Sequence, residues 1–162
     1  MTTASGILST TVTTDQQAPL GFQMEVNDGD EGLQIWTYVK AEAALAIGDI
    51  VVRDPSALTN DMYGVTPSAS GGTALVAYSC VGVAQHVIAS GSYGFVQTKG
   101  KCLVKNGTAD ITADIGITSG GSRVGAAIVV AAGVEHSVIG FALEAEATDN
   151  TTFDAYVNCL GA

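Results

Sequence analysis

The chain has 162 residues, which suits one domain able to bury roughly 70% of the surface of its unfolded form. Six basic residues against 16 acidic ones give a formal net charge of −10. Nucleic acids and anionic membranes attract clustered lysines and arginines, so this balance argues against both as partners. Charged residues make up only 14% of the chain, and Ala, Val, Ile, Thr and Gly are prominent. Such a mixture favours strands over long helices.

Neither a membrane span nor an export signal is expected. No apolar run approaches the ~20 residues that cross a bilayer, and the N-terminal residues lack the basic and apolar segments of a signal peptide. The three cysteines, Cys80, Cys102 and Cys159, form no C-x-x-C pair, and their odd number argues against a disulfide framework. We expect them to be small buried hydrophobes in a protein made in the reducing cytoplasm.

Residues 1–21 show no hydrophobic periodicity and are rich in Thr and Ser. They predict an extended N-terminal arm that becomes ordered where it packs on something else, with a terminus that has no role as the alternative. Residues 22–162 are expected to form a single β-rich domain.

Short strands alternate with turn formers along this domain. Turn residues at 27–32 precede a predicted strand at 33–40, in which Trp36 and Tyr38 share one face. Residues 41–46 predict one helical turn, and residues 126–132 predict either a buried strand or a buried helical turn. The other predicted strands are residues 50–52, 62–65, 73–78, 81–89, 95–98, 102–104, 115–117, 138–144 and 153–160. About ten short strands separated by turn signals indicate a small β-barrel or sandwich.

Two segments echo each other: residues 80–84 (CVGVA) and residues 138–142 (VIGFA). Each carries a glycine, Gly82 or Gly140, between apolar neighbours. A glycine in mid-strand indicates a bulge or a close approach of another backbone. The echo predicts two related hairpins in a pseudo-symmetric fold, although chance similarity in a sequence of low diversity explains it too.

The strand–turn–strand predicted at residues 80–104 is locally basic. No acidic residue occurs between Asp61 and Asp110, whereas Lys99, Lys101 and Lys105 all lie there. Two interpretations are open: a solvated sheet edge protected by lysines, or a docking face for an acidic protein partner.

No motif for chemistry stands out. His86 and His136 lack the spaced Cys or His partners of a zinc site. The acidic turn at 27–32 does not match the spacing of a calcium-binding EF-hand. The glycine-rich residues 116–125 lack the Gly-Lys-Ser/Thr ending of a phosphate loop. We therefore expect no catalytic residue, no metal and no cofactor, and a protein that is not an enzyme.

Five segments occur in succession: residues 36–41 (WTYVKA), 48–52 (GDIVV), 81–85 (VGVAQ), 91–97 (GSYGFVQ) and 139–142 (IGFA). Together with the apolar residues 125–132, this succession resembles the head decoration, or capsid cement, proteins of tailed bacteriophages. The resemblance implies an all-β fold on the exterior of the virion capsid, contact with the major capsid protein, and a homotrimer or other homo-oligomer. It brings no catalytic residues with it.

The expected function is that of a virion structural protein which stabilises the shell by bridging capsid subunits. The candidate partner interface comprises Lys99, Lys101, Lys105, Trp36, Tyr38 and Tyr93. One alternative is a minor tail or fibre-associated virion protein. Another is a glycan-binding β-protein in which Trp36 and Tyr38 stack on sugar rings, but these aromatics also suit the core or an oligomer interface. Deleting residues 1–20 is expected to leave a folded protein that binds the shell more weakly.

Overall fold

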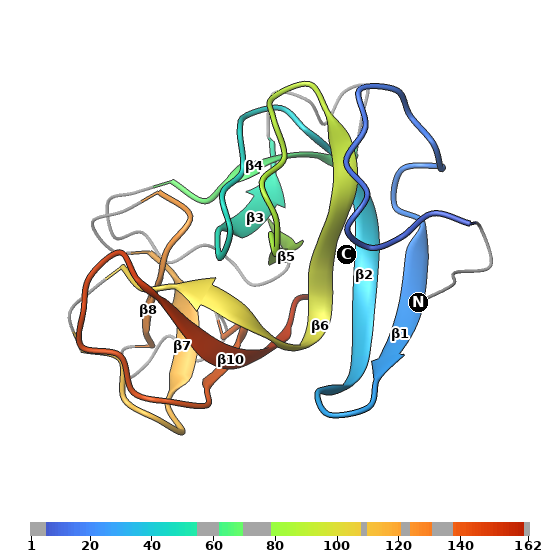
Figure 1. Cartoon of the computed structure of the whole chain (residues 1–162). Helices are drawn as coiled ribbons and strands as arrows, with labels where there is room; N and C mark the ends of the chain where they lie inside the picture. Colours follow the sequence, from blue (N-terminus) through green and yellow to red (C-terminus); the bar gives the residue numbers. More distant parts are fainter. Residues whose placement is uncertain are drawn as a thin grey trace.

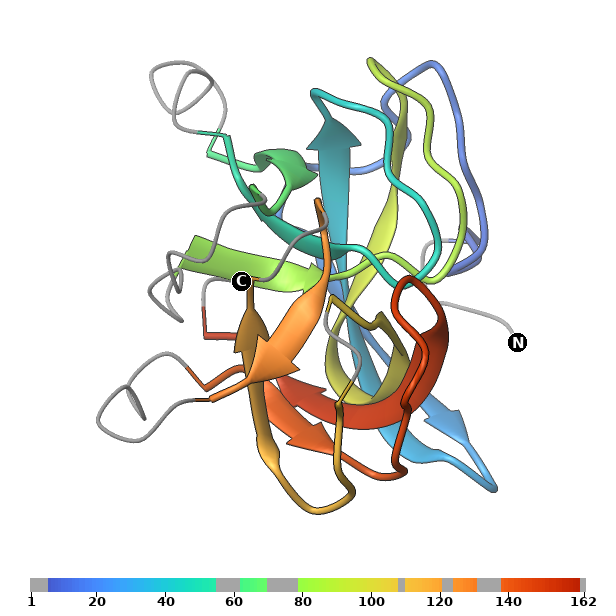
Figure 2. The ribbon, with the colours of Figure 1, turned by 90° about the vertical axis from the view of Figure 1, so that its left-hand side faces the viewer.

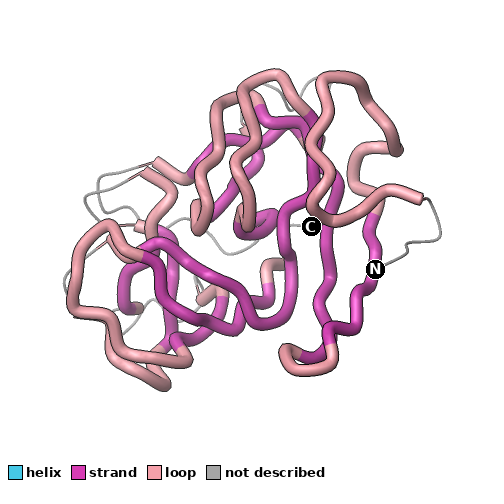
Figure 3. The backbone as a smooth tube through the Cα atoms, viewed as in Figure 1, coloured by secondary structure: helices cyan, strands magenta, loops and turns pink. Residues whose placement is uncertain are grey.

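The computed structural model describes residues 6–54, 62–69, 79–107, 110–120, 124–130 and 138–160. These residues form ten strands in one sheet and no α-helix, which confirms the predicted all-β fold (Figures 1 and 3). None of the described segments is a helix long and apolar enough to cross a bilayer. The strands are β1 (Gln23–Asp28), β2 (Gly32–Ala41), β3 (Ile50–Arg53), β4 (Gly64–Pro67), β5 (Cys80–Val83), β6 (Tyr93–Lys105), β7 (Gly116–Ser119), β8 (Ala127–Val129), β9 (Gly140–Ala142) and β10 (Thr152–Asn158).

The first part of the sheet is a closed circuit of five strands. Strands β2, β4, β3, β5 and β6 hydrogen-bond in that order, and β6 pairs again with β2. The β2–β4 pairing is parallel, whereas the other pairings in the circuit are antiparallel. Strand β1 extends the sheet on the far side of β2. We call the five closed strands, without β1, the first circuit.

The second part begins on the same long strand. From Lys99 onward, β6 pairs with β10, and β9, β7 and β8 follow in order. A single parallel bridge between Asn106 and Ala127 returns β8 to the end of β6. We call this part the second circuit. Figures 1 and 2 show its strands, yellow to red, beside those of the first circuit. Because one bridge closes it, the ten-stranded sheet as a whole is not a clear barrel.

The two circuits are equivalent strand by strand. Strand β2 corresponds to the second half of β6, β3 to β7, β4 to β8 and β5 to β9. The first half of β6 corresponds to β10. Single hydrogen bonds correspond as well. The Gly48 N–H donates to the Ala84 carbonyl at 2.7 Å, and the Asp114 N–H donates to the Ala142 carbonyl at 2.9 Å. The echo seen in the sequence is therefore a structural repeat.

The glycines of the two echoing segments occupy matching positions in this repeat, Gly82 within β5 and Gly140 at the start of β9. Gly82 pairs with Val51, and Gly140 pairs with Ile117. A Cβ atom at Gly82 would lie 2.7 Å from the carbonyl oxygen of Gln97, and one at Gly140 would collide with the backbone of β10. The predicted close backbone approach is confirmed at both positions.

Three apolar clusters form the core. One fills the first circuit, a second lies beneath the second circuit and contains all three cysteines, and a third lies between the N-terminal segment and strands β1, β2 and β6. Representative members are Val39, Val51, Val81 and Ile88 in the first, Val104, Ile117, Ile139 and Phe153 in the second, and Met24, Trp36, Tyr38 and Phe95 in the third. The prediction that the cysteines are buried is confirmed.

The N-terminal segment folds back on the sheet of its own chain (Figure 1). Thr13 and Tyr93 exchange two backbone hydrogen bonds of 3.0 and 2.8 Å, and the Gly21 N–H donates to the Tyr38 carbonyl at 2.8 Å. Ile7 and Leu20 pack against the third cluster. The described part of the predicted arm thus completes the core that covers β2.

Some local predictions are wrong. Residues 41–46 do not form a helical turn, because the backbone of Leu45 pairs with that of Ile88. The strand predicted at 81–89 ends at Val83, and strand β1 was not predicted at all. Residues 126–132, left open between strand and helix, contain strand β8. The strand predicted at 73–78 lies outside the described residues. In each wrong case a distant partner strand decides the local conformation.

Candidate functional site

Strand β6 carries the three lysines of the predicted interface, and it is not a sheet edge. It pairs with β2, β5 and β10. The interpretation of the lysines as protection for an exposed edge is therefore wrong. At Gly100 the strand passes from one circuit to the other with φ of 109°, a value that L-residues rarely adopt. A Cβ atom there would lie 2.8 Å from the Leu33 carbonyl oxygen.

Two of these lysines are neutralised within the chain. The Lys101 ammonium lies 2.8 Å from Asp154 and 3.6 Å from Glu31, and the hydrogen bond to Asp154 raises the pKa of Lys101. Lys105 forms an ion pair with Asp49. Lys99 makes no ion pair within the described residues and is half-buried. Acidic side chains from other parts of the chain thus neutralise most of the positive charge of this hairpin.

The Asp49 carboxylate is the buried member of the Lys105 pair. Only 4% of Asp49 is exposed, and its second oxygen accepts a hydrogen bond of 2.8 Å from the Ala46 N–H. A buried carboxylate is costly without a paired cation. Lys105 therefore has a structural task, linking the end of β6 to the loop before β3.

The three aromatic residues of the predicted interface belong to the third cluster. Trp36 and Tyr38 are 6% and 1% exposed, which agrees with the core interpretation left open for them. Tyr38 stacks on Tyr93 and packs against Phe95, with ring centroids 6.3 and 5.0 Å apart. Its hydroxyl accepts a hydrogen bond of 3.0 Å from the Gln17 N–H. These rings fix the N-terminal segment to β2 and β6.

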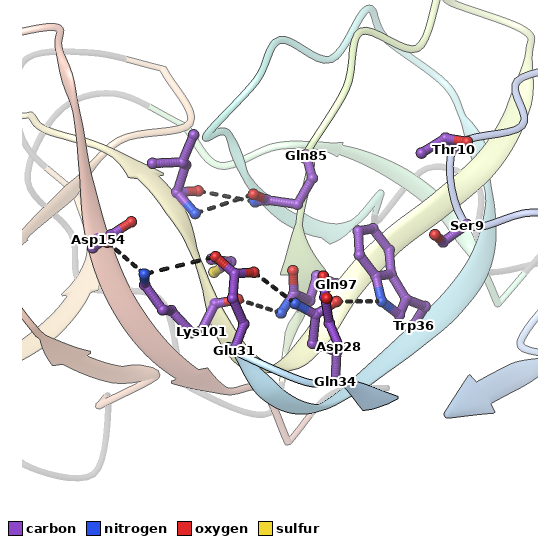
Figure 4. A pocket seen from close by; sticks show the side chains of 12 residues that line it. Ser9, Thr10, Asp28, Glu31, Gln34, Trp36, Gln85, Gln97, Lys101 and Asp154 are labelled. Carbon is purple, nitrogen blue, oxygen red and sulfur yellow. Dashed lines mark hydrogen bonds and ion pairs between the residues drawn. The ribbon is translucent and has the colours of Figure 1, made fainter. Parts of the chain in front are cut away.

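A polar cleft of about 300 Å³ lies where the β1–β2 hairpin meets the middle of β6 (Figure 4). Its wall combines carboxylates, amides, one ammonium and one indole from separate parts of the chain. The lining residues are Ser9, Thr10, Asp28, Glu31, Gln34, Trp36, Gln85, Gln97, Lys101, Cys102, Leu103 and Asp154. We call it the junction cleft, because it lies beside Gly100. Its three carboxylates and one ammonium give a formal charge of −3 + 1 = −2.

Hydrogen bonds hold the amides of the junction cleft in fixed positions (Figure 4). Gln34 donates to Glu31 at 3.0 Å and accepts from the Trp36 indole N–H at 3.2 Å. Gln97 donates to the Lys101 carbonyl at 2.7 Å. Gln85 exchanges two hydrogen bonds with the Leu103 backbone, of 2.9 and 3.0 Å, as a neighbouring strand would.

An aromatic pair lies on the same face of the sheet as the cleft. Tyr156 is the cross-strand neighbour of Lys101 on one side and of Phe141 on the other. The Phe141 and Tyr156 rings stack with centroids 5.5 Å apart, and Phe141 is 42% exposed. Side chains directly opposite in neighbouring strands share a sheet face. The surface therefore continues from Lys101 onto these two rings.

The cysteines are buried in the second cluster, and His86 is partly buried. Burial raises the pKa of the Cys102 thiol, and a hydrogen bond with Cys80 together with burial raises that of Cys159. Burial lowers the pKa of His86, whose ring stacks on Trp36. Among the described residues, no three His, Cys, Asp or Glu side chains lie close enough to hold a metal ion. His136 lies outside these residues.

The junction cleft was not predicted. Its residues come from the N-terminal segment, the β1–β2 hairpin, the loop after β5, β6 and β10, and no local motif connects them. The one signal in the sequence was the acidic turn at 27–32, which supplies Asp28 and Glu31. Which side chains face these two depends on the pairing of β6 with β2 and β10.

The sequence matches no family model and no curated protein. Among solved structures, the fold is similar to that of the N base of the head fibre gp8.5 of bacteriophage phi29. The TM-score is 0.53, the sequence identity is 16%, and the match covers 77% of this chain and 94% of the phi29 chain. At this identity the similarity shows a shared fold.

Proposed function

We propose that this chain is a structural protein of a tailed-phage virion, bound to the exterior of the head. The observation that carries the proposal is the fold shared with almost the whole length of the phi29 head fibre base. The succession of segments that resembles head decoration proteins supports the same class. In this proposal the protein acts by binding and is not an enzyme.

The proposed role is to stabilise the shell by bridging subunits of the major capsid protein. A sheet built from two equivalent circuits that share β6 supplies a rigid body. Assembly as a homotrimer or other homo-oligomer would give several weak contacts on the capsid lattice, and linked contacts bind more tightly than each alone. The formal charge of −10 keeps the free subunits apart after synthesis in the host cytoplasm.

Among the residues of the predicted interface, Lys99 is the best placed to meet a partner. Lys101 and Lys105 are paired with acidic side chains of the same chain, and Trp36 and Tyr38 are in the core. Lys99→Gln should weaken binding to purified capsids that lack the protein, as measured by cosedimentation. Lys40→Gln, which removes the same charge at the far end of β2, is the matched control. An equal loss of capsid binding in both variants would show that Lys99 is not part of the docking face.

The decisive experiment for the function is to locate the polypeptide in purified particles. Quantitative mass spectrometry should find many copies per particle, and electron cryomicroscopy should place the sheet on the outer shell in contact with the major capsid protein. Absence from the particle would refute the proposal. A few copies at the tail would replace it with a minor tail protein.

A second candidate is favoured because the phi29 neighbour is the base of a head fibre. A fibre-associated protein would occupy the head surface as well, but would carry a projecting fibre. Density extending outward from the sheet, or copurification of a fibre polypeptide, distinguishes this role from simple decoration. A shell in which density ends at the sheet excludes it.

A further inference from the structure

We propose that the junction cleft, together with the Phe141–Tyr156 pair, binds a neutral saccharide. This site is independent of the proposed attachment to a capsid. Sugars present hydroxyl groups at the ring edge and C–H groups on the ring faces, so their sites combine fixed polar groups with an exposed aromatic surface. The junction cleft supplies the first, and the aromatic pair next to Lys101 supplies the second.

The polar groups of the cleft are positioned before any ligand arrives. Gln97 is almost fully buried and held by the Lys101 carbonyl, and Gln34 is fixed between Glu31 and Trp36. A ligand that uses such groups does not have to order them, which lowers the entropic cost of binding. Flexible surface amides lack this advantage.

Unused hydrogen-bonding capacity remains at the rim. The Asp28 carboxylate and the Thr10 hydroxyl line the cleft, are exposed, and make no side-chain hydrogen bond within the described residues. A carboxylate can accept hydrogen bonds from two neighbouring hydroxyls of one sugar ring. Asp28 is therefore the expected anchor for a sugar diol.

The charge of the site restricts the ligand class. With a formal charge of −2, the cleft repels sialylated, sulfated or phosphorylated sugars. The described residues offer no cluster of three acidic or His/Cys ligands that would favour a metal ion instead. A neutral saccharide of two or three rings matches both the charge and the continuation of the surface onto Phe141.

The aromatic platform differs from the one considered in the sequence. Trp36 and Tyr38 are buried, so neither ring presents a free face of the size a sugar needs. Phe141 is exposed and backed by the Tyr156 ring, which orients it. The stacking surface is thus created by the pairing of β9 with β10.

The test uses the full chain and three neutral probes: maltotriose, cellotriose and tri-N-acetylchitotriose. Saturation-transfer NMR should show contact with at least one of them, with a Kd on the order of 1 mM. The Trp36 indole and Gln97 amide signals should shift during the titration. Sialyllactose and calcium chloride, titrated separately, should leave these signals unchanged.

Matched variants locate the site. Asp28→Ala should weaken binding about tenfold, since a hydrogen bond to a charged group is lost. Asp30→Ala removes the same charge in the same turn but outside the cleft, and should bind like the natural chain. Phe141→Ala should weaken binding about fivefold, whereas Val87→Ala, at another exposed apolar position, should not.

The proposal is overturned by any of three results. The first is the absence of contact with all three neutral probes. The second is an equal effect of Asp28→Ala and Asp30→Ala. The third is a response only to sialyllactose or calcium, which would assign the cleft to an anion or a cation. None of these results bears on whether the protein is found in virions, so the two proposals can fail separately.

Discussion

The two circuits have the same strand order and share backbone hydrogen bonds at equivalent positions, but their surfaces differ. In the first, the bridge between the loops joins Leu45 and Ile88, which are both buried. In the second, the equivalent bridge joins Ile111 to Glu146, whose carboxylate accepts the Thr148 N–H at 2.7 Å. Strand β1 and the N-terminal segment cover the first circuit, whereas the second leaves Phe141 exposed. The same strand arrangement therefore occurs twice, in a first circuit that is covered by other segments and in a second circuit that keeps an exposed apolar residue.

The turns show the same divergence. Two left-handed positions of the first circuit are Gly48 and Gly91, with φ of 83° and 81°. Their counterparts in the second are Asp114 and Asn150, with φ of 62° and 65°. Asp and Asn are the L-residues that best tolerate this region, so the second copy keeps the turns without glycine.

The junction between the circuits should be the most sensitive point. Gly100→Ala combines a left-handed backbone with a Cβ atom 2.8 Å from the Leu33 carbonyl oxygen. It should destabilise the fold by more than about 3 kcal/mol or prevent folding. Gly91→Ala, where an added Cβ meets nothing within 4 Å, should cost about 1 kcal/mol. Urea denaturation measures both, and equal costs would show that β6 is not constrained at Gly100.

The lysines of β6 should separate into structural and surface residues. Lys105→Met leaves the buried Asp49 carboxylate without its cation and should cost about 3 kcal/mol. Lys99→Met should change the free energy of unfolding by less than about 0.5 kcal/mol. Thermal and urea unfolding of the two variants test this difference. Comparable stability would contradict the pairing of Lys105 with Asp49.

Placing asparagine at the two glycine turns of the first circuit tests how much space each turn leaves for a side chain. Gly48→Asn places a Cβ atom 2.8 Å from the Lys105 backbone nitrogen and should cost about 2 kcal/mol. Gly91→Asn, at an open turn, should cost less than about 1 kcal/mol. If both are tolerated equally, the backbone of Lys105 does not restrict the side chain at position 48.

The reverse exchange should be mildly favourable. Asn150→Gly relieves the left-handed strain of an L-residue and should stabilise the protein by about 0.5 kcal/mol. Asn158→Gly, within strand β10, is the control and should destabilise by a similar amount. Differential scanning calorimetry resolves shifts of opposite sign, and shifts of the same sign would argue against strain at Asn150.

The smallest effect concerns pH and the loop after β5. His86 has a pKa below its ordinary 6.5 because it is partly buried, with its ring stacked on Trp36. As the pH falls below about 6.5, the unfolded chain binds a proton that the folded chain does not, so stability decreases. Above about pH 6.5, His86 is neutral in both the folded and the unfolded chain, so its contribution to the free energy of unfolding no longer changes with pH. His86→Phe should reduce the loss of stability between pH about 7.5 and about 5.5. An unchanged slope would place the pH sensitivity elsewhere.

Much of the fold followed from local sequence. Alternating apolar residues identified β2, and the glycines at 82 and 140, each between apolar neighbours, identified the close backbone contacts. Cysteines without partners at metal or disulfide spacing indicated burial. These features depend on a residue and its neighbours along the chain, so they can be predicted from the sequence alone.

The rest depended on which strands meet. The lysines at 99, 101 and 105 gave a basic hairpin in sequence, but Asp154, Glu31 and Asp49 come from other strands and loops and neutralise two of them. The repeat was visible only as a faint echo, because equivalent positions share hydrogen bonds and φ values rather than side chains. The junction cleft was invisible, because its parts lie far apart in the chain. Sequence alone determined the strand content, whereas charge pairing, exposure and the cleft were decided by the register of β6 against β2 and β10, a non-local property of the folded chain.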